Sequence, residues 1–161
     1  MRKEDEFVKV IKNHEAIIFK ITTIYTDHRE DQKDLYQDIV FQLWKSFDSF
    51  KNESKISTWM YRVALNTALT HLKKSKRLPF SIGIDEVILE QIESYDASFE
   101  EHLKIMYRHI KQLNVLEKGL ILLFLEGKKY EEIAEITGLS TTNVGTRISR
   151  IKKKLKEQII K

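Results

Sequence analysis

The sequence predicts an all-α fold, built as two small helical domains joined by an acidic linker. Only one Pro and five Gly occur in 161 residues, so few positions would interrupt a helix. Apolar residues recur at helical spacing through most of the chain. Residues 79–103 hold seven acidic side chains and no basic one, between two blocks in which basic side chains outnumber acidic ones. We therefore expect domains at 1–78 and 101–161, with a linker at 79–100.

The composition limits what the protein can do. A net charge of +4 and a pI near 9.1 suit a polyanionic partner. The absence of cysteine excludes disulfides and thiolate metal sites. The five His show no paired metal-ligand spacing, and no Gly-rich phosphate loop is present. We expect no metal, no cofactor and no enzymatic activity.

The hydropathy pattern predicts a cytoplasmic protein that does not insert into membranes. The first 15 residues are charged throughout and lack the apolar core of a signal peptide. The longest apolar run, Leu120–Leu125, is far too short to span a bilayer.

In the first domain, three helices are predicted. Residues 5–26 have a broad apolar face, although the β-branched residues within 17–25 leave a strand open as an alternative. A second helix is predicted over 31–47 and a third from Ser57 to about residue 76. The polar segment 50–55 should form the loop between them.

The helix predicted over 31–47 carries two distinct stripes. The stripe that should face the core consists of Leu35, Ile39, Leu43 and Phe47. Its neighbour, acidic at its start, consists of Asp34, Gln37, Asp38 and Phe41. The helix dipole explains acids in a first turn, but it does not explain why Phe41 and Trp44 border this second stripe. A protein-binding face and a plain solvated face remain equally open.

The third helix carries a continuous stripe of cations and amides. Its members are Arg62, Asn66, Thr70, Lys73 and Arg77. Cations at a helix C-terminus complement the dipole, which accounts for the last turn of the stripe. This does not account for Trp59, which heads the stripe beside the polar loop. Basic residues beside a stacking aromatic suit unpaired DNA, whose base faces are available.

The second domain ends in a pattern typical of a helix-turn-helix. Further helices are predicted over 100–113 and 115–126, and a short one at 85–92 in the linker. After residues 130–137, Gly138 can take the left-handed backbone that ends a helix, and Ser140 can cap the next one.

The last helix divides into two faces. One face consists of Val144, Ile148, Ile151 and Leu155. The opposite face and its flank consist of Thr142, Asn143, Thr146, Arg147, Arg150 and Lys153. This pattern predicts a recognition helix in the major groove. A helical hairpin with a solvated basic face is the plainer alternative.

Three segments resemble, in the family's order, parts of bacterial sigma factors. The polymerase-clamp-binding segment is matched by DQKDLYQDIVFQLWKSFDSF. The promoter-melting segment is matched by STWMYRVALNTALTHLKKSKR. The reader of the upstream element is matched by LEGKKYEEIAEITGLSTTNVGTRISRIKKKL. With two domains and nothing else, the chain resembles the extracytoplasmic-function type, with region 2 at 1–78 and region 4 at 101–161.

This resemblance implies a role for each stripe. The face that docks on the clamp coiled coil of the largest polymerase subunit is matched by Asp34, Gln37, Asp38, Leu43 and Trp44. The loop that captures a flipped base of the minus-10 element is matched by Asn52, Glu53 and Ser54. Positions beside that pocket are Trp59, Arg62 and Asn66, and phosphate-gripping positions are Lys73, Lys74 and Arg77. The reader of the minus-35 element is matched by Thr142, Asn143, Thr146, Arg147, Arg150 and Lys153.

The implied partners are core RNA polymerase, through its clamp coiled coil and flap region, and promoter DNA in duplex and single-stranded form. Minimal sigma factors are often held by an anti-sigma protein, and the sequence itself identifies none. The linker resembles the segment threaded toward the RNA exit path. Three positions depart from the family pattern: Asp38 replaces a Glu, Asn114 a Pro, and Gly145 a Lys or Arg.

Two other functions compete with this interpretation. A helix-turn-helix regulator that does not bind core polymerase would need only residues 104–161, and would leave both first-domain stripes without a purpose. An adaptor that binds polymerase without recognising promoters would keep only the Asp34 stripe. The charge pattern further suggests a compact free state, in which the acidic linker holds two basic domains together.

Overall fold

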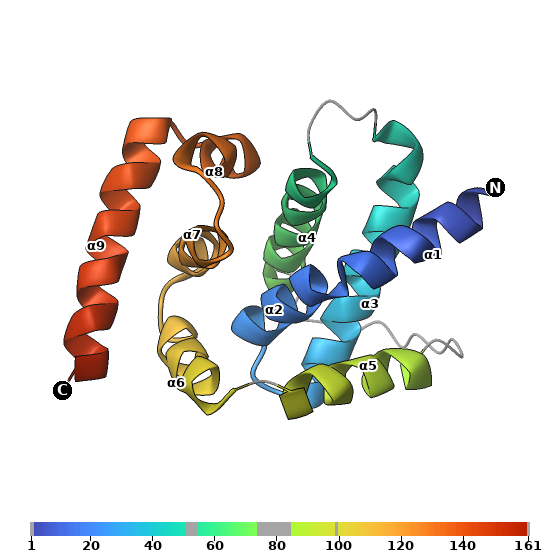
Figure 1. Ribbon diagram of the computed structural model, residues 1–161, viewed down its shortest axis with the longest axis horizontal. Coiled ribbons are helices and arrows are strands. Elements are labelled where there is room, and N and C mark those ends of the chain that lie inside the picture. The colour runs from blue at the N-terminus through green and yellow to red at the C-terminus, as the bar shows by residue number, and fades with distance from the viewer. Residues whose placement is uncertain (1, 51–54, 74–84, 99, 161) are drawn as a thin grey trace. The chain divides into compact units, whose positions relative to one another are not determined.

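The computed structural model describes residues 2–50, 55–73, 85–98 and 100–160 (Figure 1). All regular structure within these ranges is helical, which confirms the predicted all-α class. The chain forms two compact units, Met1–Ser98 and Phe99–Lys161. Within the described residues, no helix is long and apolar enough to cross a membrane.

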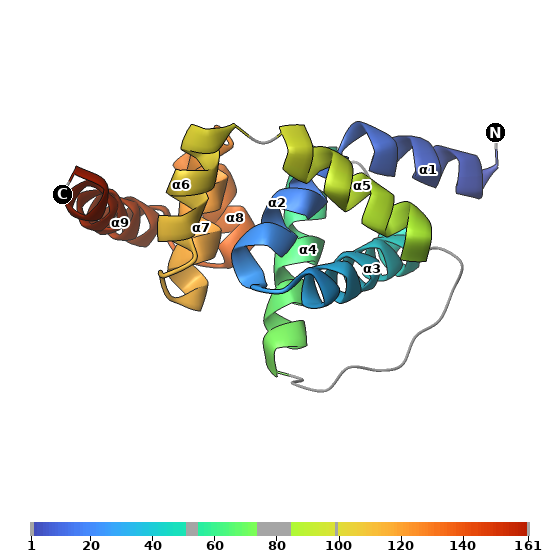
Figure 2. The ribbon, with the colours of Figure 1, turned by 90° about the horizontal axis from the view of Figure 1, so that it is seen from below.

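The first unit is built around three mutually packed helices. Its elements are α1 (Lys3–Asn13), α2 (Glu15–Tyr25), α3 (Arg29–Ser46), the 3-10 turn η1 (Phe47–Ser49), α4 (Ile56–Lys73) and α5 (Asp85–Ser98). Helices α2, α3 and α4 contact one another, and α5 lies on α2 and α3 (Figure 2). The fully buried side chains at their centre include Ile18, Ile21, Leu35, Ile39, Leu43 and Met60.

The segment expected as one helix over 5–26 is two helices, because the backbone bends at His14. This residue has φ −129° and ψ 20°, and its N–H reaches both Val10 and Ile11. The bend lets α1 bury Phe7 and Ile11 while α2 buries a different set of isoleucines. Residues 17–25 are helical rather than extended, since core packing outweighs their intrinsic preference for strands.

Helix α5 corrects the predicted linker. It runs six residues beyond the short helix expected at 85–92 and packs on the first unit. Ile92 is fully buried, the Tyr95 ring stacks on Phe19 with centroids 5.2 Å apart, and Asp96 pairs with Arg29 at 3.1 Å. Residues 85–98 therefore belong to the first unit, and residues 79–84 of the predicted linker lie outside the described residues.

The second unit is a four-helix arrangement in which the last helix contacts the other three. Its elements are α6 (Glu101–Ile110), α7 (Val115–Leu125), α8 (Tyr130–Thr137) and α9 (Thr141–Ile160). Its fully buried side chains include Ile110, Leu120, Leu122, Leu123, Ile133, Val144 and Ile148. The hydrophobic face predicted for the last helix is thus the one that packs.

Local signals set the turns of this unit as the sequence predicted. Gly138 has φ +82°, and its N–H donates to the Ala134 carbonyl at 2.8 Å. Only glycine takes this left-handed backbone at little cost. The Ser140 hydroxyl accepts the Asn143 N–H at 3.1 Å, which caps α9.

Candidate nucleic-acid and polymerase interfaces

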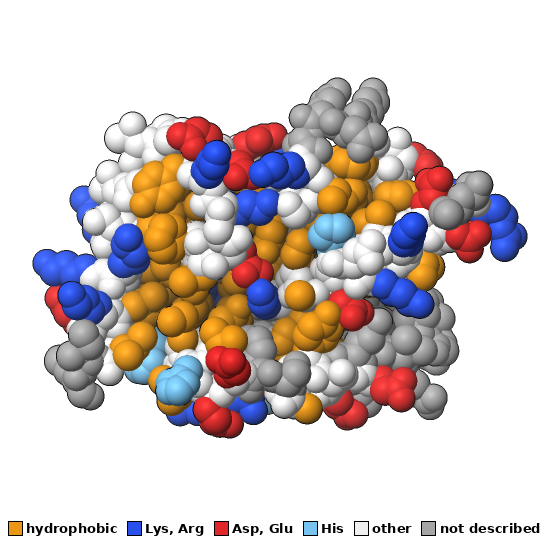
Figure 3. Space-filling model, viewed as in Figure 1, with side chains coloured by type: hydrophobic (Ala, Val, Ile, Leu, Met, Phe, Trp, Pro, Cys, Tyr) orange, Lys and Arg blue, Asp and Glu red, His pale blue; other side chains and the backbone are white. Residues whose placement is uncertain are grey.

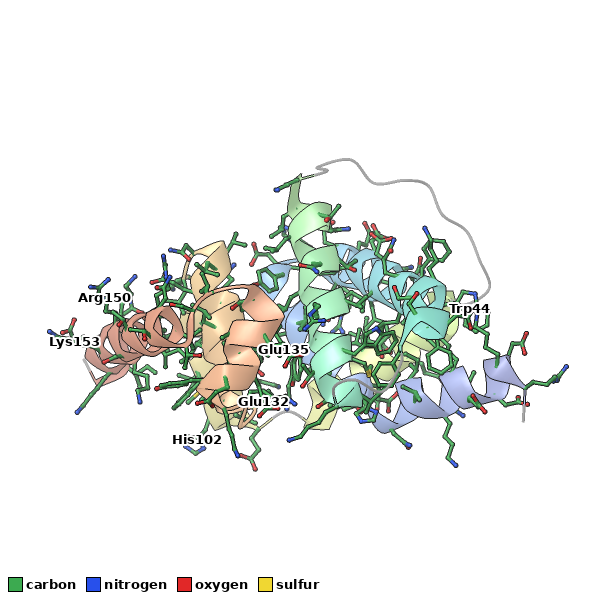
Figure 4. All side chains as sticks on the ribbon, turned by 90° about the horizontal axis from the view of Figure 1, so that it is seen from above. Trp44, His102, Glu132, Glu135, Arg150 and Lys153 are labelled. Atoms are coloured by element: carbon green, nitrogen blue, oxygen red, sulfur yellow. The ribbon has the colours of Figure 1, made fainter. Side chains whose placement is uncertain are left out.

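The outer face of α9 gathers the residues expected to read duplex DNA. Thr142, Thr146, Arg150 and Lys153 are exposed, whereas Asn143 and Arg147 on the flank are half-buried. Arg150 and Lys153 extend from the helix into solvent (Figure 4). Because α6, α7 and α8 cover only the opposite side, α9 offers a row of donors and cations fit for a DNA groove.

Two residues on the flank of α9 are bonded to each other. The Arg147 Nε donates to the Asn143 Oδ1 at 2.8 Å. They are four residues apart, so their side chains leave the helix on the same side, one turn apart.

Glu117, which is not among the residues predicted from the sequence, links α7 to α9. Its carboxylate accepts the Asn114 N–H at 3.1 Å and pairs with the Lys154 ammonium at 3.1 Å. The Glu117 side chain is only 16% exposed, and this burial by itself would raise the pKa of its carboxyl. The Asn114 N–H and two cations, Lys154 and Arg147, outweigh burial and hold that pKa below its usual range.

Part of this contact was visible in the sequence. Asn114 followed by a Glu three residues later is a capping-box pattern, and both of its hydrogen bonds form at the start of α7. The partner Lys154 lies 37 residues away, and no local pattern points to it.

Gly145 lowers the intrinsic helix propensity of α9, but its lack of a side chain matters for packing. A Cβ at this position would lie 3.3 Å from Cε2 of Tyr130. The missing side chain therefore lets the ring at the start of α8 approach α9 closely. The position faces α8, so a Lys or Arg side chain here would start against the Tyr130 ring.

The stripe expected to bind polymerase is solvent-facing on α3. Asp38 and Phe41 are exposed, the latter at 53%, and Asp34 and Gln37 are half-exposed. The His71 Nδ1 on α4 lies 3.0 Å from the Asp38 Oδ2, which joins this stripe to the neighbouring helix.

Two residues assigned to the same docking face have other surroundings. Leu43 is fully buried in the core, as its place in the apolar stripe predicts, and so it adds no exposed surface to this docking face. Trp44 is half-buried, with its ring edge-on to Phe7 at 5.1 Å and the Lys3 ammonium 4.2 Å from its centroid. Helix α1 thus covers part of Trp44.

Trp59 also differs from expectation. Only 8% of this residue is exposed, and its ring lies against Phe50 and Phe47, at centroid distances of 5.1 and 6.2 Å. In this structure the Trp59 ring therefore packs inside the first unit, whereas the sequence pattern places it at the surface. The ring was misplaced because an aromatic next to a polar loop suits either a surface or a small core.

The rest of the predicted minus-10 surface is only partly described. Arg62 is half-buried, and Asn66 and Lys73 are exposed on α4. Asn52, Glu53 and Ser54 lie outside the described residues, as do Lys74 and Arg77. The structure thus brings the middle of the stripe to the surface of one helix.

Apolar side chains also reach the surface of the second unit (Figure 3). The large exposed ones on α6 and α7 are Leu103, Ile105, Val115, Leu116 and Leu125. Each of these residues is between 37% and 42% exposed.

Family models match both units. Residues 10–78 match the model described as Sigma-70 region 2, and residues 103–155 match Sigma-70, region 4. Among curated proteins, RNA polymerase sigma factor SigV of Bacillus subtilis (strain 168) is 31% identical, over 96% of this chain and 91% of that protein. The ECF RNA polymerase sigma-E factor of Escherichia coli (strain K12) is also 31% identical, over 80% and 74%.

Solved structures share the fold. CnrH, in complex with the cytosolic domain of CnrY, gives a TM-score of 0.66 at 20% identity, over 98% of this chain and 89% of that one. The sigma factor RpoE, in complex with the anti-sigma factor NepR from Bartonella quintana, gives 0.68 at 19% identity, over 97% and 95%. The two regions, their order and the curated relatives agree: this chain belongs to the sigma-70 family, as an ECF-type sigma factor that directs RNA polymerase to promoters.

Proposed function

We propose that the two units have different roles in promoter recognition. Helices α3 and α4 carry the role of the first unit, and helix α9 carries that of the second. The observation that carries this proposal is the clean division of α9, which buries Val144, Ile148 and Ile151 and turns its polar row outward. Helix α9 reads the minus-35 element as duplex, because only the major groove distinguishes all four base pairs.

The first unit acts on polymerase and on the melted strand. Asp34, Gln37 and Asp38 of α3 dock on the clamp coiled coil, with Phe41 as an apolar contact. Asn66 and Lys73 of α4 lie along the non-template strand of the minus-10 element. Extruding a base costs a few kcal/mol, which contacts to the base and its phosphates must offset, and opening a whole bubble also needs the polymerase.

The second unit also contacts polymerase. The exposed apolar side chains of α6 and α7 suit the flap region, which would hold the second unit near the upstream duplex. The site of action is the cytoplasm, where promoters and polymerase meet.

A regulator of the anti-sigma class belongs among the proposed partners. Support comes from two proteins of this fold, each solved in complex with a partner, one of them an anti-sigma factor. A purified candidate should compete with core polymerase for the stripe of Asp34, Gln37 and Asp38. A candidate that binds without competing would not fit this role.

The decisive test is binding to core RNA polymerase. The full chain should bind with nanomolar affinity, and reversing two charges together, Asp34→Lys with Asp38→Lys, should abolish binding. The matched control is Glu4→Lys with Glu6→Lys, two exposed charges on α1 outside the stripe, which should leave binding unchanged. If the chain does not bind core polymerase but binds duplex DNA in a salt-sensitive way, it acts as a DNA-binding regulator that works without polymerase contact.

A further inference from the structure

We infer that Asn143 and Arg147 read the duplex as one coupled unit that presents hydrogen-bond donors, and not as two independent contacts. This inference rests on the proposed reading of duplex DNA by α9. The observation behind it is the 2.8 Å bond in which the Arg147 Nε donates to the Asn143 Oδ1.

The chemistry of the guanidinium fixes the orientation of the amide. Arginine has five N–H donors and no acceptor, so the Asn143 atom that faces it must be the oxygen. The amide NH₂ of Asn143 then points away from Arg147, and Arg147 keeps its two terminal NH₂ groups. The pair therefore offers N–H groups at both ends, and its one acceptor atom, the Asn143 oxygen, already accepts one hydrogen bond between them.

This arrangement changes which bases suit Asn143. An asparagine reads adenine in bidentate fashion by donating to N7 while its oxygen accepts from N6. In this pair the Asn143 oxygen already accepts one hydrogen bond, so an adenine N6–H would have to share that oxygen with Arg147. Guanine presents two acceptors, O6 and N7, in the major groove and suits a donor.

The surroundings hold the pair in place before DNA arrives. Asn143 and Arg147 are both half-buried, which restricts their side chains. The Ser140 hydroxyl fixes the first turn of α9 through the Asn143 N–H, and the Glu117 carboxylate on α7 acts electrostatically on Arg147. A bond that is already formed costs little reorganisation when the helix enters the groove.

The coupling predicts non-additive mutations. Groups that share a hydrogen bond deviate from multiplicative losses, whereas the losses of independent groups simply multiply. If Asn143 and Arg147 act as one unit, the first substitution already disrupts the unit, so the double variant loses less than the product of the single losses. We expect Arg147→Ala to do two things: to remove one base preference and to free the Asn143 oxygen, so that adenine gains several-fold at the Asn143 contact. Arg147→Lys keeps the positive charge but not the guanidinium geometry. This variant should therefore also gain preference for adenine at the Asn143 contact, while it retains affinity for phosphate.

The test selects promoters from a library that is randomised over the upstream duplex, using the full chain with core polymerase. Asn143→Ala, Arg147→Ala and their double variant are compared with a matched pair, Thr142→Ala and Arg150→Ala. The double loss should be about three- to tenfold smaller than the product of the single losses for the bonded pair, and multiplicative for the control. Unfolding midpoints of all variants show whether each still folds.

Three results are decisive. A smaller-than-multiplicative double loss together with a gain of adenine in Arg147→Ala supports the coupled unit. Multiplicative losses, with the base at the Asn143 contact unchanged, would overturn the coupling and leave the reading of duplex by α9 intact. A wild-type chain with no upstream base preference would overturn both.

Discussion

The two helices expected to meet DNA, α4 and α9, distribute their side chains differently. On α9 every predicted reading residue is at least partly exposed and every apolar stripe residue is buried. On α4 the exposed positions begin only after the first turns: Trp59 and even Thr58 are buried, whereas Asn66 and Lys73 face solvent.

The difference follows from what surrounds each helix. Helix α9 meets the rest of its unit on one side along its length, so the sequence pattern maps directly onto exposure. Helix α4 starts inside a cluster of aromatic rings supplied by η1 and Phe50, and ends beyond it. A polar stripe therefore predicts a surface only where a helix is covered from one side.

The largest effect should come from removing the ring of Trp59. Trp59→Ala deletes a buried aromatic against Phe47 and Phe50, and should destabilise the first unit by about 3–5 kcal/mol. Trp59→Phe should retain most of the stability. Denaturant unfolding followed by circular dichroism measures both. An unchanged unfolding midpoint for Trp59→Ala would mean that this ring is exposed. Helices α4 and α9 would then not differ in the way described above.

A smaller effect is expected on the outer face of α9. Arg150→Ala and Lys153→Ala remove exposed cations, so each should lower the slope of log affinity against log salt by about 1 if it contacts a phosphate. Stability should not change. Duplex binding by the full chain across a salt series gives the slope, with Lys9→Ala on α1 as a control that leaves it unaltered. Equal slopes throughout would mean that Arg150 and Lys153 do not contact phosphates.

The cap at the start of α7 should contribute about 1 kcal/mol, the usual contribution of a helix cap to stability. Asn114→Ala removes the cap of α7 and should cost this amount. The Glu117 carboxyl contributes through its lowered pKa: its folded pKa lies below the unfolded value of about 4.3, so its stabilisation is fully present above that pH. The stabilisation is lost as pH falls through the folded pKa.

Unfolding measured from pH 7 down to pH 3 tests this sign. Glu117→Gln should be less stable than wild type near neutrality, and the difference should shrink on acidification. A difference that grows as the pH falls would contradict the assignment. Asn114→Ser, which can still cap, serves as the conservative variant of the Asn114 site.

The smallest effect is expected inside the first unit. The Tyr36 hydroxyl is buried and has no hydrogen-bond partner among the described residues. Burial, with smaller contributions from nearby Glu15 and Tyr95, raises the pKa of this phenol, so it stays neutral. Tyr36→Phe removes an unsatisfied group and should leave the midpoint unchanged or slightly raised. A loss above about 1 kcal/mol would show that the hydroxyl has a partner.

The sequence predicted those features whose causes lie within a few residues. Gly138 and Ser140 act on their own turn, and the apolar row of α9 repeats every turn. Features that depend on distant partners escaped prediction. Helix α5 is held by Phe19 and by Arg29, the latter 67 residues from its partner Asp96.

Amphipathic side chains were the second source of error. The Trp59 ring is apolar enough for a core and polar enough for a surface, so its neighbours in the sequence do not decide between them. Leu43 differs from Trp59, since its place in an apolar stripe correctly predicts its burial.

The position of α5 decides where the first unit can be cut. A fragment that ends at residue 78, the boundary suggested by charge alone, would remove Ile92 and Tyr95 and open the faces of α2 and α3 to water. Newly exposed apolar surface of this kind promotes aggregation. A fragment that ends at Ser98 keeps α5 on the faces of α2 and α3. This fragment should therefore stay soluble when the two units are separated.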